Sequence, residues 1–290
     1  MMPRRSRRRR AFETARDAVG FLRHTRSPAA LMRVLRPEPR VLNSVASKEP
    51  VPATALATRL RTLGHALALA SVEGTPTSEA VAPVEEVARA LWHVTPADLH
   101  DDATRIAFFL NLYNVLVLHG AAALGVRSSV LEEPSFFSAV AYRVGDAILT
   151  PDRIEHGLLR KNAVHLGRRT LPSNNPAHAF APSRVEPRIH AALVCASEGC
   201  PPIAFYEPTR LEGQLDLAMR HFVNLHVHVE GGRAHLPLVF GHYAADFGGE
   251  EGAFELVRAH ADPPLAAALG GVRSIVYDPW DWRFAVRLAT

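Results

Sequence analysis

The chain has 290 residues, of which 48% are hydrophobic and 21% charged, and its formal net charge is +4 at pH 7. This composition supplies a sizeable hydrophobic core and excludes a wholly disordered chain. Two cysteines are too few for a disulfide framework, and we find neither an apolar run of membrane-span length nor a secretory signal. We therefore expect a cytoplasmic protein with no transmembrane segment.

The first residues are strongly basic, with six arginines within residues 1–10. A charge run of this kind is expected to be solvated, and the alternative is weak contact with nucleic acid or an acidic membrane surface. Residues 11–26 and 28–36 have helical spacing but end in a proline-spaced stretch. We treat residues 1–50 as a basic tail with an accessory helical region, and residues 51–290 as a single domain.

The first part of the domain is expected to be helical. Helical spacing predicts helices at residues 53–70 and 84–94, separated by a turn-rich loop at 74–78. The stretch 104–120 is apolar on almost every side, which at helical period predicts a buried central helix. We expect an α+β fold in which a short antiparallel sheet packs on this helix, at about residues 104–122, with further helices around it.

Two asparagines lie inside the expected central helix. Asn111 and Asn114 are three residues apart and therefore share one face. Buried amides must be hydrogen-bonded, so these side chains indicate a polar network within the core. They either belong to a functional site or hold neighbouring loops in place.

A hairpin and a helix are expected next. Two short strands within residues 141–150 surround Gly145, which indicates a tight turn. Thr150 is then a helix N-cap, and the helix that follows contains Glu155, His156 and Arg160. His156 and Arg160 are one turn apart on the same face, whereas Glu155 and His156 are adjacent and are expected to point apart.

Both cysteines lie in one stretch, residues 188–202. The apolar run 191–194 predicts a buried strand that ends in a small-residue turn. A turn that carries a thiol, Cys195, and a hydroxyl, Ser197, at the end of a strand is a common way to present a nucleophile. The alternative is that the cysteines are buried small hydrophobes without a chemical role.

The C-terminal part has ordinary helix and hairpin signals. Residues 209–224 and 251–261 are expected helices, and 273–277 a final strand. A hairpin is expected at residues 225–240 across two glycines. His226 and His228 alternate onto one face of its first strand, but no carboxylate or third ligand is evident beside them. We therefore predict no metal site and no cofactor.

Several stretches together resemble the family catalogued as domain of unknown function 547. Three are long: AFFLNLYNVLVLH at 107–119, LTPDRIEHGLLR at 149–160 and RIHAALVCASEGCPP at 188–202. Two are shorter: YAADFG at 243–248 and YDPWDW at 277–282. The resemblance covers a core of about residues 100–284. It implies no specific activity, but it marks eight positions: Asn111, Asn114, Glu155, His156, Arg160, His190, Cys195 and Ser197.

The side chains at these positions favour a thiol hydrolase or acyltransferase of the peptidase, amidase or transglutaminase type, acting on a peptide or a small acyl substrate. Cys195 would be the nucleophile and His156 the base, which would lower the pKa of the thiol. Asn111 or Asn114 would orient the base better than its sequence neighbour Glu155. Substrate contacts would come from Ser197, Arg160 and His190, with the Ser197 hydroxyl near an oxyanion. On the expected strand, His190 is an odd offset from Cys195 and would face the opposite side.

Two other functions stay open. Cys195 and Cys200 would cycle through a disulfide or bind zinc in a redox or metal protein. A polar core without catalysis would serve a scaffold that binds a peptide or another protein.

Overall fold

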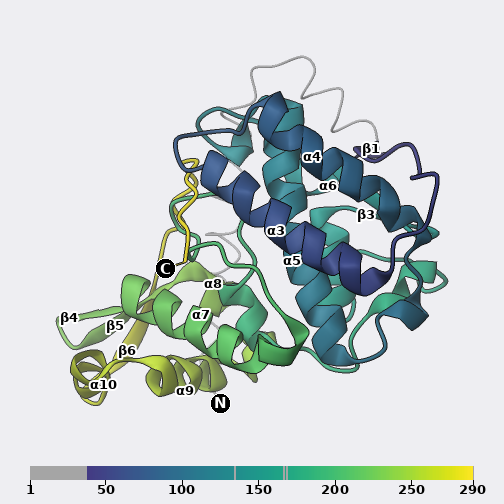
Figure 1. Cartoon of the computed structure of the whole chain (residues 1–290). Coiled ribbons are helices and arrows are strands. Elements are labelled where there is room, and N and C mark those ends of the chain that lie inside the picture. The colour runs from purple at the N-terminus through teal and green to yellow at the C-terminus, as the bar shows by residue number, and fades with distance from the viewer. Residues whose placement is uncertain (1–37, 134, 166, 168, 290) are drawn as a thin grey trace.

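The computed structural model describes residues 38–133, 135–165, 167 and 169–289. Figure 1 shows two groups of elements in this part of the chain. The larger group contains β1 (Arg40–Val41), α3 (Ala53–Ala70), α4 (Ser78–Ala88), α5 (Asp102–Leu124), α6 (Phe136–Ala139), β2 (Val140–Val144) and β3 (Ala147–Leu149). The smaller group contains α7 (Leu211–His226), β4 (His228–Glu230), β5 (Arg233–Pro237), α8 (Leu238–His242), α9 (Glu250–His260), α10 (Pro263–Leu269) and β6 (Ser274–Asp278). The basic tail and the helices expected at 11–26 and 28–36 lie outside the described residues.

The central helix is α5. It begins where the Asp101 carboxylate accepts the N–H of Thr104 at 2.7 Å and ends at Gly125, whose φ is 70°. Every residue from 106 to 121 is buried, which confirms the predicted central helix. Within the described residues, α5 is the one helix long and apolar enough to cross a membrane, and 89% of its apolar window is buried inside the protein. The expectation that no apolar stretch has membrane-span length is therefore corrected, although the core helix of a soluble protein meets the same criterion.

Each group of elements contains a three-stranded sheet. In the first sheet β1 pairs parallel to β2 and β2 pairs antiparallel to β3, with the predicted turn at Gly145. In the second sheet β4 pairs antiparallel to β5 and β5 pairs parallel to β6. The α+β class is confirmed, but both sheets are mixed rather than purely antiparallel. The reason is that a strand distant in sequence joins each hairpin in the parallel direction.

Part of the region assigned to the accessory segment belongs to the main body. Asn43 is buried, and its amide nitrogen donates to the carbonyls of Ala88 and Arg143 at 2.8 and 2.9 Å. Its amide oxygen accepts the N–H of Arg143 at 2.7 Å. Residues 40–43 therefore extend the first sheet, and the boundary expected at residue 50 does not separate them from the domain.

The predicted helices are present, with shifted ends. The helix expected at 53–70 has these bounds in the structure. The helix expected at 84–94 begins earlier, at Ser78, because the Thr77 hydroxyl accepts the N–H of Ala80 at 3.4 Å, and it continues through Pro83 into a 3₁₀ helix, η1 (Arg89–His93).

One predicted strand is wrong. Residues 187–191 form a 3₁₀ helix, η6 (Pro187–Ala191), and the apolar run continues as irregular chain. The backbone N–H and C=O groups of this run find hydrogen-bond partners without a neighbouring strand. Asn114 accepts the N–H of Val194 at 3.0 Å and donates to the carbonyl of Ala192 at 3.1 Å. A short apolar run shows that a segment is buried, but periodicity alone does not separate strand from other buried chain.

The side chains form two hydrophobic cores. The larger core surrounds α5, and the smaller core is formed by α7, α8, α9 and the second sheet, with Phe222, Phe240 and Val257 at its centre. Trp280 packs against both cores.

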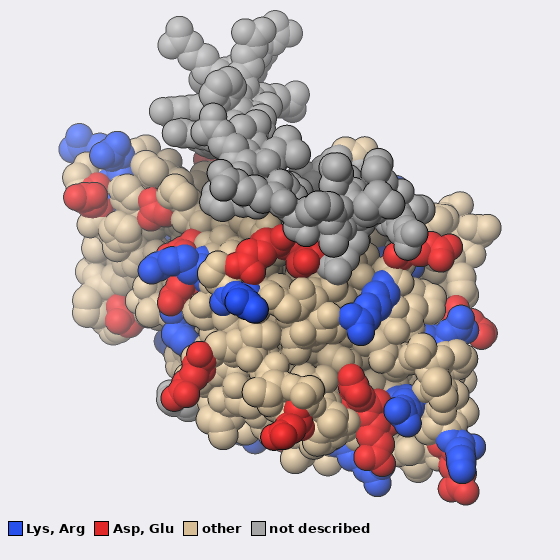
Figure 2. Space-filling model, turned by 90° about the horizontal axis from the view of Figure 1, so that it is seen from above, with Lys and Arg blue, Asp and Glu red and all other residues tan. Residues whose placement is uncertain are grey.

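The surface seen from above mixes the two charges. Figure 2 shows acidic and basic side chains interspersed over the described part of this face. Neither charge forms there the broad patch that nucleic-acid binding uses. A nucleic-acid or membrane partner for the basic tail stays a prediction, because the tail lies outside the described residues.

Candidate functional site

Both cysteines lie on one tight loop, which we call the thiol loop (residues 195–200). Ala196 has a φ of 58°, in the left-handed region that costs a residue with a side chain about 1 kcal/mol. Gly199 lies against the indole of Trp280, where a Cβ would come within 2.8 Å of the ring. Backbone strain of this kind is concentrated at functional sites, where the surrounding structure holds it in place.

The thiols contact each other and Ser197. The Sγ atoms of Cys195 and Cys200 are 2.7 Å apart, and Cys195 Sγ is 3.1 Å from Ser197 Oγ. The N–H of Cys195 donates to Cys200 Sγ at 3.0 Å, and the Trp280 indole donates to Ser197 Oγ at 2.9 Å. Cys195 is half-buried, whereas Cys200 and Ser197 are buried. The loop therefore holds the Cys195 thiol against a fixed hydroxyl and a second thiol.

The pKa values of the two thiols are shifted in opposite directions. Burial raises the pKa of Cys195, and the neighbouring Cys200 raises it further. Burial would also raise the pKa of Cys200, but hydrogen bonds from Cys195 and Ser197 lower it below the ordinary value. The expected depression of the Cys195 pKa by His156 is wrong in direction. Cys195 is a protonated thiol at rest, and it needs a base before it can attack.

The two asparagines of α5 hold loops. Asn111 pairs with the backbone of Tyr206 through both amide atoms, at 2.7 and 2.9 Å. Asn114 holds the chain that leads into the thiol loop through Val194 and Ala192. The sequence left two roles open for these asparagines, a functional site or the holding of loops, and the structure shows that they hold loops. Their amide groups are bonded to backbone rather than to His156.

The helix with Glu155, His156 and Arg160 is a π-helix, η4 (Arg153–Leu159). The Thr150 hydroxyl accepts the N–H of Arg153 at 3.1 Å, as an N-cap does. The N–H of Arg160 donates to the Glu155 carbonyl at 2.8 Å, which is the wide i→i+5 spacing. A wide turn separates adjacent side chains by a smaller rotation, so His156 Nδ1 and Glu155 Oε1 are 3.7 Å apart instead of pointing apart.

A buried ionic cluster joins this helix to a distant segment, η8 (Ala244–Phe247). The Arg160 guanidinium pairs with both oxygens of Asp246, with Nη2 and Oδ1 at 3.1 Å. His190 Nε2 and Asp246 Oδ2 are 2.9 Å apart, and Arg160 Nη1 and His156 Nδ1 are 3.1 Å apart. The four side chains are between 2% and 5% exposed. Burial would raise the pKa of Asp246, but the bonds from His190 and Arg160 lower it to about 2.

Aromatic rings enclose this cluster. Tyr243 stacks on His190 with ring centroids 4.2 Å apart, and the guanidinium carbon of Arg160 lies 4.5 Å from the Tyr243 ring centroid. Burial and the neighbouring Glu155 carboxylate, which accepts its hydroxyl, raise the pKa of Tyr243. His165 stacks on His156 with centroids 3.8 Å apart.

The hydrogen bonds define which ring nitrogen carries the proton in His156 and in His190. An arginine only donates, so His156 Nδ1 accepts from Arg160 and the imidazole is neutral with its proton on Nε2. Burial lowers the pKa of His156, in agreement with a neutral ring. An ionised carboxylate only accepts, so His190 donates from Nε2 to Asp246. In the neutral ring, His190 Nδ1 therefore has a lone pair that accepts a proton.

Tyr113 of α5 is buried. Burial raises the pKa of Tyr113, and the Glu155 carboxylate raises it further. The structure thus brings Glu155, His156, Arg160 and His190 together, and brings Cys195 to Ser197 and Cys200. It records no hydrogen bond between Cys195 and His156.

Three residues of this site were missed. Tyr243 and Asp246 are within the stretch 243–248, which was noted for its resemblance but given no role, and Tyr113 is within 107–119. The sequence signal that could have identified Asp246 is that it is the one acidic residue in the otherwise uncharged stretch 243–248. The expected histidine pair is also corrected: His226 ends α7 and does not share a strand face with His228. Among the described residues, metal-ligating side chains gather instead at His228, Glu230 and His235.

Residues 96–223 match the model of a family described as protein of unknown function, DUF547. This match confirms the resemblance seen in the sequence. It includes α5, η4 and the thiol loop, and it ends before Tyr243 and Asp246. Neither the search of curated proteins nor the search of solved structures found a match.

Proposed function

We propose that this chain is a cysteine-dependent acyl-transfer enzyme in which Cys195 is the nucleophile and His190 is the base. The supporting observation is the 2.9 Å contact between His190 Nε2 and Asp246 Oδ2. His190 is five residues before Cys195 in the chain. A carboxylate that holds one imidazole nitrogen orients the other to take a proton from a nucleophile. We assign the base to His190 in place of His156, because the Nδ1 lone pair of His156 is occupied by Arg160.

The proposed reaction has two steps. Cys195 Sγ attacks the carbonyl carbon of a peptide, amide or small acyl substrate while its proton passes to His190 Nδ1. The leaving group departs with that proton, and the acyl group stays on sulfur until water or an amine removes it. In this proposal the Ser197 hydroxyl and the neighbouring loop amides would stabilise the oxyanion. Arg160 keeps Asp246 ionised, so that Asp246 holds His190 in one orientation.

A second function is favoured by the thiol pair. The 2.7 Å approach of Cys195 and Cys200 suits thiol–disulfide exchange. In that reaction the two thiols of the protein reduce a substrate disulfide, and the products are a Cys195–Cys200 disulfide and two substrate thiols. No histidine is needed as an oriented base for it.

One experiment separates these functions. The protein is incubated with p-nitrophenyl acetate, and the acetylated residue and its rate of formation are measured by mass spectrometry. We expect acetyl on Cys195 in the wild type and in Cys200→Ser, and none on that residue in Cys195→Ser. His190→Gln should slow acylation by about 100-fold, as expected for loss of a general base.

The matched control is His156→Gln, which alters the same buried cluster and should slow acylation by less than about tenfold. Equal losses in both histidine variants would remove His190 as the base. A wild-type protein that is not acetylated, but is oxidised by glutathione disulfide in a reaction lost in Cys200→Ser, would establish the exchange function. If neither reaction is observed, only the scaffold function would remain.

A further inference from the structure

The hairpin β4–β5 carries two histidines and a carboxylate on one face. His228 of β4 lies directly opposite His235 of β5, and Glu230 is two residues beyond His228 on the same face. The hairpin turns at Gly231 and Gly232, whose φ values are 56° and 72°. Two successive positive φ values form a tight turn that matches the twist of the strands, so the three side chains are held on a fixed backbone.

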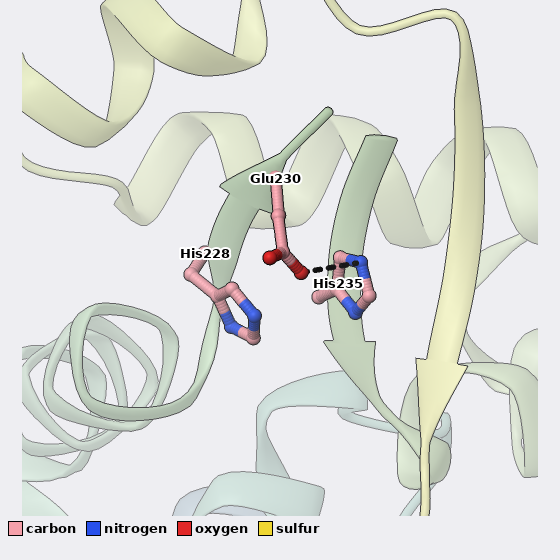
Figure 3. Close-up of side chains that lie close together, drawn as sticks. All are labelled: His228, Glu230 and His235. Atoms are coloured by element: carbon pink, nitrogen blue, oxygen red, sulfur yellow. Dashed lines mark ion pairs between the residues drawn. The ribbon is translucent and has the colours of Figure 1, made fainter. Parts of the chain in front are cut away.

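The three side chains converge. One nitrogen of each imidazole and one carboxylate oxygen of Glu230 lie within 4.8 Å of one another. Figure 3 shows the Glu230 carboxylate extending from the end of its strand toward the two imidazole rings. The rings of His228 and His235 face each other, with centroids 4.7 Å apart. Although Arg233 is opposite Glu230 in the register, the recorded ion pair of the carboxylate is with His235 Nε2, at 4.0 Å.

A second carboxylate selects the ligand atom of His235. Nδ1 of His235 is 3.0 Å from Asp278 Oδ1, which is at the end of the neighbouring strand β6. Since the carboxylate accepts, the proton of the neutral ring is on Nδ1 and the lone pair is on Nε2. That Nε2 atom is buried and has no hydrogen-bond partner among the described residues. A buried acceptor without a partner is costly, and a metal ion at this point would satisfy it.

We propose that His228, Glu230 and His235 form a binding site for a divalent transition metal ion, with Zn²⁺ as its expected occupant. Two imidazole nitrogens and one carboxylate oxygen are a zinc ligand set that leaves a fourth position for water. Asp278 is a positioning residue, because a carboxylate on the second nitrogen of a ligating histidine fixes its orientation and raises its basicity. The site is separate from the thiol loop, and its presence does not depend on the proposed enzymatic activity. It revises the expectation that the chain has no metal site.

The test uses the full chain, freed of metal by chelation and titrated with Zn²⁺ in a calorimeter. We expect one Zn²⁺ per chain at this site, with at least a 100-fold loss of affinity in His228→Ala and in His235→Ala. Asp278→Ala should weaken binding by about 10- to 100-fold, and Asp278→Asn, which still accepts from Nδ1, by less. Circular dichroism checks that each variant is folded. His100→Ala is the matched control, because His100 is exposed and 3.3 Å from an acid, Asp101, but belongs to no such cluster among the described residues.

Co²⁺ provides an independent measurement. Nitrogen and oxygen ligands should give visible absorption bands without the near-ultraviolet charge-transfer band of a thiolate ligand. No Zn²⁺ binding by the wild type, or binding that His228→Ala leaves unchanged, would overturn the proposal. A thiolate band that is lost in Cys200→Ser, in place of the nitrogen and oxygen signature, would transfer the metal to the thiol loop and would equally overturn it.

Discussion

The buried ionic cluster and the β4–β5 hairpin contain the same kinds of side chain but differ in where their cation comes from. Each combines two histidines with a carboxylate: His156, His190 and Asp246 in one, His228, His235 and Glu230 in the other. In the cluster the cation is supplied by the protein itself, as the Arg160 guanidinium. On the hairpin the acceptor of His235 faces a neighbouring carboxylate at 4.0 Å. The cluster therefore balances its charges within the fold, whereas on the hairpin Glu230 is exposed and the buried Nε2 of His235 has no hydrogen-bond partner among the described residues.

The largest expected difference between the two regions is in stability. Asp246→Ala leaves Arg160 and His190 buried without their carboxylate, and we expect it to reduce the free energy of unfolding by about 3–5 kcal/mol. Glu230→Ala removes an exposed carboxylate and should change it by about 0.5 kcal/mol or less in metal-free protein. Urea denaturation of the two variants measures both values. Similar losses in both would show that the cluster gains nothing from its burial and pairing.

Zinc should narrow this difference, because it adds stability that depends on the hairpin. If the site binds as proposed, Zn²⁺ at 100 times its dissociation constant stabilises the folded chain by about 2.7 kcal/mol. His235→Ala should abolish this gain, while Asp246→Asn should keep it. Thermal unfolding with and without Zn²⁺ checks this. A gain that survives His235→Ala would mean that the ion binds elsewhere.

Acid should affect the cluster through Asp246. Its pKa in the folded protein is about 2, against an ordinary value of 3.8. Since the folded value is the lower one, the unfolded chain binds more protons between these values. The contribution of the ionised carboxylate is thus present above pH 4 and is lost as the pH falls through about 2. The shift corresponds to about 2 kcal/mol. Urea denaturation from about pH 5 to about pH 2 should show the difference between wild type and Asp246→Asn shrinking; a constant difference would contradict it.

Local patterns were a reliable guide where local physics decides the structure. The bounds of α3, the burial of α5 and the turns at Gly145 and Gly231 follow from helical spacing, from apolarity on all sides and from glycine's access to positive φ. The strand expected at 191–194 failed because its burial was visible in the sequence but its partner was not. That partner is the side chain of Asn114, which is 80 residues away from Val194.

The candidate site shows the same division. The resemblance marked Glu155, His156, Arg160 and His190, and the structure places all four in one buried cluster. It did not indicate that Asp246 connects them, because Asp246 is 86 residues from Arg160 and 56 from His190. The adjacency of Glu155 and His156 in space was also missed, since the sequence does not distinguish a π-helix from an α-helix.

The sequence by itself determined the α+β class, the central helix, the positions of the hairpins and the stretch that carries the thiols, because each depends on periodicity, burial or turn chemistry within a few residues. Only the tertiary structure decided which acid holds which histidine, which nitrogen of each ring keeps its proton, and which thiol is the more acidic. These properties depend on distances between side chains that are far apart in the chain, and on the loss of water around them.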